Sequence, residues 1–426
     1  MKIKDNLKRY WRMLDDQAKI YSLSYNKKDT SVFRLSVTLT ENIKEDILNK
    51  AVLLALNSFK SFRVKLQRGF FWYYMEYNSK NPIVSIEDDY PFRRLINKKN
   101  NDYLFKVTYF NNKINVDYFH VLTDGNGGAL FLKEIVCRYI ELLYPKKFKY
   151  EATNIVIDDV SNDYKKNYLK SKKRGYKYPV AYTIKGEALK YGKVSLNHFI
   201  INLNDIKLKY KNSNCTLSIF LVSMLAYSLY ETNYKKHNGK KPINICVPIN
   251  LKNYFASKTN SNFVSFMMVS LSFKSNKKYK FDDIIKMVKK EFDKKLKYDK
   301  IISNMTSDGK LINNVFVRLV PLLLKKCMVL IGTLSFKKHF TMTFSNLGII
   351  EMDSKYSKYV KDYFFIMSPD WAEKLRCGVC SYGDNLVVSF GSNIKSNEIE
   401  IKFKDLLDEF KIKYSIEGNG INVISN

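Results

Sequence analysis

The sequence predicts an α+β protein built from two halves, and three observations support this. Both halves mix segments of strand-like alternation with segments of helical periodicity. The 426 residues, 46% of them hydrophobic, are enough for two domains with substantial cores. Between the halves, periodicity fades into lysine-rich stretches with glycine and proline. We therefore expect an N-terminal subdomain over residues 1–150, a linker or crossover over 151–190, and a C-terminal subdomain over 191–426.

The first half is expected to order its elements as helix, strand, helix, several strands and helix. The predicted ranges are a helix over 1–20, a strand over 33–39, a helix over 43–55, strands over 69–77, 103–110 and 113–121, and a helix over 132–143. In the first helix, Leu7, Trp11 and Leu14 would share one side. Asn42 and Glu45 have the spacing of a capping box at the start of the second.

The second half repeats a coarse strand, helix and sheet order. The predicted ranges are a strand over 194–203, a helix over 216–230, strands over 243–247 and 263–273, helices over 281–298 and 311–331, strands around 341, 375 and 386, and a helix over 397–410. The most apolar region, Val315 to Phe336, is interrupted by charged residues and Pro321. No run of about 20 apolar residues remains, so we predict no transmembrane segment, and a core helix or one next to a membrane.

Composition limits the partners and the compartment. Lysine and arginine number 73 against 41 acidic residues, a formal net charge of +32. Because the lysines are spread over every segment without an arginine-rich stripe, we interpret the charge as a general bias and predict no nucleic-acid partner. The first residues lack the apolar core of a signal peptide, and six cysteines are scattered singly or within apolar runs. We expect a cytoplasmic protein with reduced thiols.

One stretch, residues 118–128, combines a histidine, an acid and three glycines at a strand-to-helix junction. Alternation over 113–121 places His120 on the inward face of a strand, and helical periodicity begins after the glycines. A neutral imidazole there can act as a general base, and Asp124 can cap the helix. The alternative for His120 alone is a hydrogen-bonded core residue.

The segment from His120 to Gly125 resembles the His-x-x-x-Asp-Gly motif of the chloramphenicol-acetyltransferase-like acyltransferases. This superfamily includes condensation domains of peptide synthetases and alcohol O-acetyltransferases. Three further blocks are similar to the alcohol-acetyltransferase branch and occur in the same order: residues 9–15, residues 247–252 with Asn262-Phe263 after them, and residues 344–348. The resemblance covers nearly the whole chain.

The resemblance implies two chloramphenicol-acetyltransferase-like subdomains, each a mixed sheet flanked by helices, with the active-site channel between them. It implies acyl transfer from an acyl-CoA, in the first place acetyl-CoA, to a small-molecule alcohol or amine, and no metal. His120 would be the general base, Asp124 would orient the loop through a charge pair or cap, and Gly125 would keep the loop compact.

Two other functions stay open. Many condensation domains carry two adjacent histidines, whereas Phe119 occupies the first position here. This favours a free-standing enzyme, but a condensation-like enzyme that takes its donor from an acyl carrier protein remains an alternative. A non-catalytic binding scaffold of the same fold is the third possibility. An enzyme should expose His120 to a channel, whereas a scaffold can seal it in the core.

Candidate substrate-binding residues come from two other segments. Thr341, Thr343 and Ser345 alternate on one strand face, and Ser345 is our preferred donor to a developing oxyanion. We place Thr343 and Asn346 in the same binding group; a solvated sheet edge would explain the hydroxyls equally well. Lys252 can meet a phosphate of the acyl carrier or simply be solvated.

Two cysteines, Cys377 and Cys380, have the spacing of metal ligands. No second pair or histidine cluster accompanies them, and on a strand their side chains would face opposite sides. We therefore interpret both as packing residues and predict no metal site.

Overall fold

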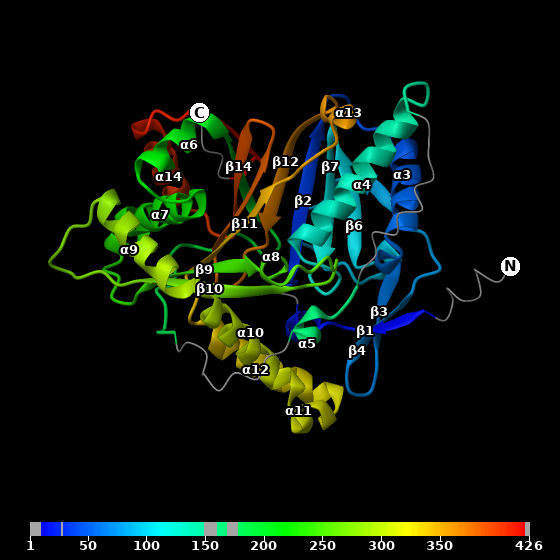
Figure 1. Ribbon diagram of the computed structural model, residues 1–426, viewed down its shortest axis with the longest axis horizontal. Helices are drawn as coiled ribbons and strands as arrows, with labels where there is room; N and C mark the ends of the chain where they lie inside the picture. Colours follow the sequence, from blue (N-terminus) through cyan, green and yellow to red (C-terminus); the bar gives the residue numbers. More distant parts are fainter. Residues whose placement is uncertain (1–9, 27–28, 149–159, 168–177, 422–426) are drawn as a thin grey trace.

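The computed structural model describes residues 10–26, 29–148, 160–167 and 178–421, with only the backbone at 307–313. Two halves lie side by side, each a mixed sheet with helices packed on it (Figure 1). Each half has its own large apolar core. The predicted α+β architecture of two subdomains is confirmed.

The sheet of the first half has five strands. Their order is β12 (Val360–Met367), β2 (Val32–Leu39), β7 (Lys113–Phe119), β6 (Phe105–Phe110) and β5 (Val84–Ile86). The helices α3 (Glu45–Ser58) and α4 (Gly125–Leu143) pack together, and α4 covers β2. β6 and β7 form the predicted hairpin, whose turn at Asn111 has φ of 50°.

The sheet of the second half has seven strands. Their order is β10 (Val264–Leu271), β9 (Ile243–Asn250), β11 (Met342–Ile349), β13 (Leu375–Tyr382), β14 (Asn385–Ser392), β8 (Ser195–Asn202) and β15 (Tyr414–Gly418). Its helices are α6 (Leu203–Asn212), α7 (Leu217–Leu229), α9 (Phe281–Lys295) and α14 (Glu398–Glu409). Shorter helices are α5 (Asp163–Lys166), α8 (Lys252–Phe255) and α13 (Ser354–Ser357).

Strand β12 joins the two halves. It belongs to the second half by sequence but pairs antiparallel with β2, and it also packs against β13 and β14. On β13, the Cys377 side chain lies in the core of the second half and that of Cys380 in the core of the first. Both cysteines are buried and free, so their interpretation as packing residues on opposite faces is confirmed.

The start of the described chain departs from the prediction. Leu7 lies outside the described residues, and Trp11 belongs to a strand, β1 (Trp11–Met13), rather than to a helix. β1 completes a small sheet with the hairpin of β3 (Val64–Arg68) and β4 (Tyr73–Tyr77), which replaces the single strand predicted over 69–77. Helix α2 (Asp16–Ser24) begins only after Asp15, whose side chain accepts from the Ala18 amide.

Other differences arise from tertiary contacts. The capping box predicted at Asn42 and Glu45 is wrong: α3 begins at Glu45, and the Lys44 amide donates to the hydroxyl of Tyr139 instead. The sequence analysis also missed α6, β12 and β15. Both β12 and β15 are held by pairing with distant strands, which local periodicity does not reveal.

The single helix predicted over 311–331 is divided among three helices. This range contains the end of α10 (Tyr298–Asn313), all of α11 (Val315–Leu319) and the start of α12 (Leu322–Lys337). The Asn314 side chain caps α11, and Pro321 precedes α12. In α12 only Leu322 and Lys325 are buried, so the core-helix interpretation is wrong.

Among the described residues, no single helix has both the length and the apolar character needed to cross a membrane; one strongly bent pair, Leu203–Asn212 with Leu217–Tyr234, meets those criteria jointly.

Candidate active site

The His-x-x-x-Asp-Gly segment lies where β7 leads into α4, at the contact between the halves. The His120 amide donates to the carbonyl of Ser31 at 2.9 Å. His120 directly follows β7 and Ser31 directly precedes β2, so this bond extends the pairing of the two strands by one residue. The Thr123 hydroxyl donates to the carbonyl of Asn260 at 2.7 Å and so ties the loop to the second half. Helix α4 begins at Gly125, directly after the predicted cap Asp124, so the glycines lie in its first turn and not in a turn before it.

The His120 ring is held by both halves. It stacks on Tyr21, with ring centroids 4.3 Å apart, and meets the edge of Phe33 at 5.1 Å. Its Nδ1 lies 2.9 Å from Oδ1 of Asn262. Asn262 therefore places the ring, a role the sequence analysis did not assign although Asn262 stood in one of the similar blocks.

The same amide fixes the tautomer of His120. The Nδ2 group of Asn262 donates to the main-chain carbonyl of His120 at 3.0 Å and to Oδ2 of Asp15 at 3.2 Å. Because Nδ2 faces these two oxygens, Oδ1 is the atom turned to the imidazole, and Oδ1 can only accept. Nδ1 must then carry the proton, which leaves a lone pair on Nε2.

His120 Nε2 makes no hydrogen bond to any residue within the described ranges, and the half-buried ring lines a cavity. Burial lowers the pKa of His120 below its ordinary value of 6.5, although the charge of Asp124 and the hydrogen bond with Asn262 both raise it. Near neutral pH the ring is therefore uncharged, with a free acceptor nitrogen directed to a space where a ligand fits.

Asp124 makes both of the contacts that were predicted as alternatives, a helix cap and a charge pair. Its Oδ1 accepts from the Gly127 amide at 2.9 Å, and its Oδ2 lies 2.7 Å from Nζ of Lys252. The Asp124 side chain is 2% exposed and that of Lys252 12%. Lys252 is thus not a solvated lysine: its ammonium is committed to Asp124.

The glycines of the motif allow close packing. A Cβ on Gly127 would lie 2.7 Å from the carbonyl oxygen of Asn260 and still closer to Thr123, whereas one on Gly125 would meet the Leu347 side chain at 2.5 Å. The Leu347 side chain could move away from a Cβ at position 125, but the Asn260 backbone could not move away from one at position 127. Position 127 therefore tolerates substitution less than position 125 does.

The cavity beside His120 has a volume of about 350 Å³ and is lined by both halves. The first half contributes Tyr21, Phe33, His120, Asp124 and Gly125, and the second contributes residues of β9, β10, β11, β12 and α12. His120 therefore faces a cavity between the halves and is not sealed in the core, as a non-catalytic scaffold would allow.

The predicted hydroxyl strand, β11, forms part of this wall. β11 lies between β9 and β13, so the solvated-edge explanation is wrong. Thr343, Ser345 and Asn346 all line the cavity. The Thr343 hydroxyl donates to Glu373, and the Asn346 amide donates to Ser218 at 3.4 Å. The main chain of Ser345 is paired with β13, but its side chain has no hydrogen-bond partner among the residues described, which leaves the hydroxyl available to a ligand.

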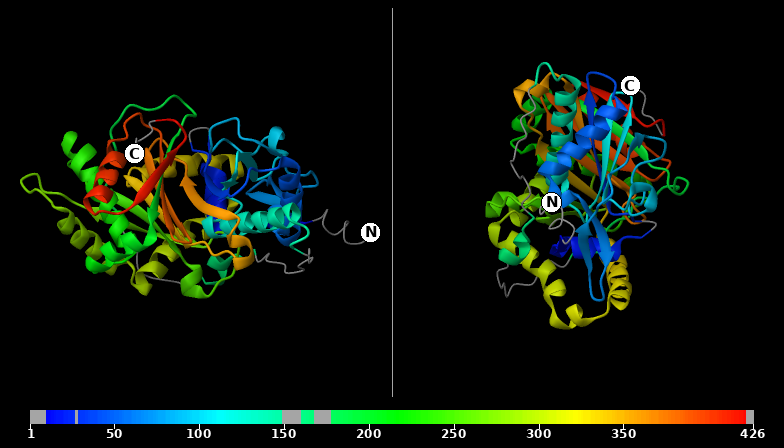
Figure 2. Two further views of the ribbon diagram at one scale, coloured as in Figure 1. Left: turned by 90° about the horizontal axis from the view of Figure 1, so that it is seen from above. Right: turned by 90° about the vertical axis from the view of Figure 1, so that its right-hand side faces the viewer.

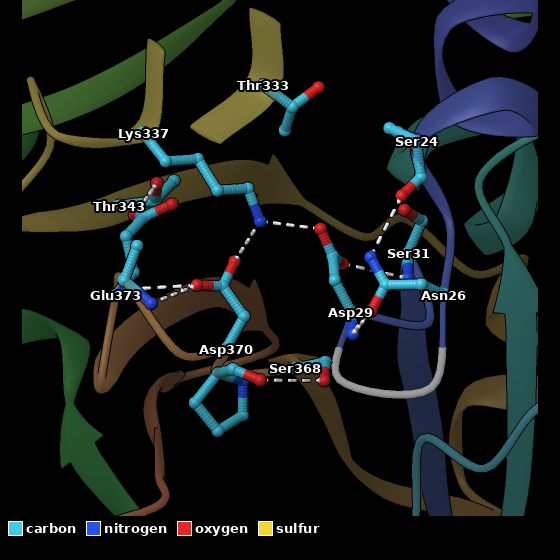
Figure 3. Close-up of polar contacts among 12 residues, drawn as sticks. Ser24, Asn26, Asp29, Ser31, Thr333, Lys337, Thr343, Ser368, Asp370 and Glu373 are labelled. Carbon is cyan, nitrogen blue, oxygen red and sulfur yellow. Dashed lines mark hydrogen bonds and ion pairs between the residues drawn. The ribbon is translucent and has the colours of Figure 1, made fainter. Parts of the chain in front are cut away.

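A charged cluster, defined here by Asp29, Lys337, Asp370, Glu373 and Arg376, was missed by the sequence analysis. Lys337 lies between Asp29 and Asp370, with Nζ to Oδ2 distances of 2.5 and 2.6 Å (Figure 3). Arg376 contacts Asp370 and Glu373 at 2.6 and 2.7 Å. Although burial opposes it, the charges of Arg376 and Lys337 lower the pKa of Asp370 to about 2. All but Asp370 line the cavity and give it a polar end.

The other histidines lie outside this cavity. His198 is buried on β8, where Nδ1 lies 2.9 Å from the hydroxyl of Ser389, and burial lowers its pKa to about 3. His237 and His339 are on loops away from the cavity lining. The sequence motif alone therefore identified the histidine that faces the ligand space.

The sequence and the fold were compared with those of known proteins. A model of the alcohol acetyltransferase family matches residues 160–411, more than half of the chain. No curated protein sequence matches significantly. Among solved structures, TRI101 of F. sporotrichioides, complexed with coenzyme A and T-2, superposes with a TM-score of 0.62 at 9% identity, covering 95% of this chain and 99% of that one.

Two further structures have the same fold. The TRI3 trichothecene 15-O-acetyltransferase from Fusarium sporotrichioides has a TM-score of 0.61 at 11% identity, covering 94% of each chain. The starter condensation domain of rhizomide synthetase RzmA, in complex with C8-CoA and Leu-SNAC, has a TM-score of 0.62 at 11% identity, covering 96% of this chain and 95% of that one. The resemblance to the chloramphenicol-acetyltransferase-like superfamily is confirmed, and the chain is an acyltransferase that belongs to the alcohol acetyltransferase family.

Proposed function

We propose that the protein transfers an acyl group, in the first place acetyl, from an acyl-CoA to a hydroxyl or amine of a small molecule bound in the cavity. One observation carries the proposal: Nε2 of His120 presents a lone pair to the cavity while Asn262 holds the proton on Nδ1. The coenzyme A and C8-CoA bound to two structures of the same fold support the choice of donor.

In the proposed reaction, the acceptor O–H or N–H donates its proton to His120 Nε2 as the acceptor atom attacks the thioester carbonyl. The carbonyl oxygen becomes an oxyanion, for which Ser345 is the preferred hydrogen-bond donor. Collapse of this intermediate breaks the C–S bond. The leaving thiolate takes the proton from the imidazolium, so His120 returns to its starting state and no acyl-enzyme forms.

Asp124 acts in this proposal as a positioning residue. Its carboxylate is already shared by the Gly127 amide and the Lys252 ammonium, so it is not available to accept a substrate proton. The contacts fix the loop that follows His120 to both α4 and α8. Lys252 in turn stabilises the Asp124 charge, which is the role we now assign to it instead of phosphate binding.

The decisive test is thiol release from acetyl-CoA and from longer acyl-CoAs against a panel of alcohols and amines. Acceptor-dependent thiol release, with the acylated acceptor found by mass spectrometry, is the expected result. Release that requires a phosphopantetheinylated carrier protein would favour the condensation-like alternative. No transfer with either kind of donor would favour the binding scaffold.

Ser345→Ala is expected to lower kcat, by up to about a hundredfold, and to change KM little, because an oxyanion hydrogen bond is made mainly in the transition state. Steady-state kinetics with acetyl-CoA and the best acceptor measure this. Ser354→Ala, which alters an exposed serine of α13, is the matched control. Unchanged kcat in Ser345→Ala would remove Ser345 from the mechanism.

The acid limb of the pH profile is expected to have its midpoint below pH 6.5 in kcat/KM, because burial lowers the pKa of the His120 base. Asn262→Ala should move that midpoint further down, since the hydrogen bond with Asn262 raises this pKa. It should also cut turnover by up to about a hundredfold through loss of ring placement. An acid limb identical to that of the wild type would contradict the assigned hydrogen bond.

A further inference from the structure

An exposed apolar surface runs along α11, α12 and the β3–β4 turn. We call it the apolar ridge and define it by Phe70, Phe316, Leu319, Leu323, Met328 and Ile331. These side chains are between 56% and 82% exposed. In Figures 1 and 2 the helices α11 and α12 form one extremity of the molecule, beside the β3–β4 hairpin. The Leu322 amide donates to the Phe70 carbonyl at 2.9 Å, so helix and hairpin present one continuous surface.

Helix α12 is turned the opposite way from an ordinary surface helix. Its lysines lie inward: Lys325 donates to the carbonyl of Phe71 at 2.8 Å and sits 3.5 Å from the ring centroid of Trp72, and Lys337 bridges Asp29 and Asp370. The side chains of Leu323, Met328 and Ile331 face outward, whereas Leu322 packs inward with Lys325. A surface helix in water has the reverse arrangement, so this orientation requires a non-aqueous partner outside the fold.

The segment that forms α11 and α12 contains basic residues and no acidic residue. No aspartate or glutamate occurs between Asp308 and Glu351 in the sequence, a stretch that contains Lys310, Arg318, Lys325, Lys326, Lys337 and Lys338. Three basic side chains are exposed on the elements that carry the ridge or directly after them: Arg318 of α11, Lys338 after the end of α12, and Arg68 of β3. An apolar surface edged by cations matches the interface of an anionic lipid bilayer.

We propose that the apolar ridge inserts into the interfacial layer of an anionic bilayer, with the neighbouring cations on the lipid headgroups. A second copy of the chain is the less suitable occupant, because it carries the same net charge of +32 and the same cations around its own ridge. A bilayer supplies both the apolar layer and the negative charge.

The location also relates the ridge to the cavity. Thr333, Phe336 and Lys337 of α12 line the cavity, while Leu323, Met328 and Ile331 of the same helix face outward. One helix therefore separates the lipid layer from the ligand space. If the proposed acyl transfer takes place in this cavity, the position of α12 favours acceptors or acyl chains that partition into membranes; this inference rests on the proposed function.

The test is co-flotation of the full chain with vesicles of phosphatidylcholine alone or of equimolar phosphatidylcholine and phosphatidylglycerol. The wild type should bind the anionic vesicles at least about tenfold more tightly, and added salt should weaken binding. Phe316→Asp/Leu323→Asp should bind at least about a hundredfold more weakly. Leu208→Asp, on an equally exposed leucine of α6, should bind as the wild type does.

Equal binding by Phe316→Asp/Leu323→Asp and the wild type would overturn the proposal, as would absence of binding to anionic vesicles. Self-association of the wild type that the double substitution abolishes, measured by sedimentation, would assign the ridge to a second copy instead. Both substituted side chains are exposed, so unchanged thermal unfolding should verify the fold. His120→Ala should bind vesicles normally, which separates failure of this proposal from failure of acyl transfer.

Discussion

Replacing His120 by alanine is expected to lower kcat for acyl transfer by at least about a hundredfold, the lower range for loss of a general base. The cavity holds no second histidine among its described lining residues, and Asp124 is occupied by the Gly127 amide and Lys252. Without Nε2 the acceptor must attack while still carrying its proton. The loss should therefore appear in kcat, measured by thiol release at saturating acetyl-CoA and acceptor.

Two further variants separate base chemistry from folding. His120→Asn can keep a donor near Oδ1 of Asn262 but has no basic nitrogen, so it should be as inactive as His120→Ala. His237→Ala alters an exposed histidine remote from the cavity and should keep full turnover. Turnover of His120→Ala within a few-fold of the wild type would exclude His120 as the base.

The local part of the site was predictable because its signals are local. Alternation placed His120 at the end of a strand and Asp124 had the position of a helix cap, and the structure agrees with both. The glycines were predicted to form a turn before the helix, but they form the first turn of α4 itself. Within the motif, backbone geometry and side-chain spacing over a few residues determine the arrangement.

The parts that were missed depend on distant pairs. Asn262 reaches His120 across 142 positions of sequence, and Lys337 reaches Asp29 across 308. A single sequence gives no signal for such pairs, since each side chain alone is a common polar residue. Strand β12 was missed for the same reason: pairing with β2, far earlier in the chain, holds it in the sheet.

The interpretation of the α12 segment as a core helix was wrong for a different reason. The sequence correctly indicated an apolar segment, but composition does not say whether the protein's own core or an outside partner covers it. The contacts of Lys325 and Lys337 orient the helix with that face outward. The contacts of these two lysines thus determine which side of α12 is buried, whereas the hydrophobic pattern alone would place both lysines in solvent.

Asp124→Ala is expected to lower the free energy of unfolding by about 3–5 kcal/mol, because it removes the helix cap and leaves the Lys252 ammonium, 12% exposed, without its carboxylate. Turnover should fall as well, since the loop after His120 loses its contact with α8. Denaturant unfolding at neutral pH and thiol release measure the two effects.

A double-mutant cycle isolates the charge pair from the cap. Lys252→Met alone leaves the Asp124 carboxylate buried and unpaired, so it should also be strongly destabilising. The combination Asp124→Asn/Lys252→Met restores a neutral pair and keeps a side chain that can cap α4, so it should be more stable than Lys252→Met. The second single variant of the cycle is Asp124→Asn. If the losses of Asp124→Asn and Lys252→Met add up to that of the double variant, the 2.7 Å ion pair contributes nothing beyond its separate parts. Recovery of stability in the double variant without recovery of turnover would show that the charge pair itself, and not only the compact loop, is needed to position His120.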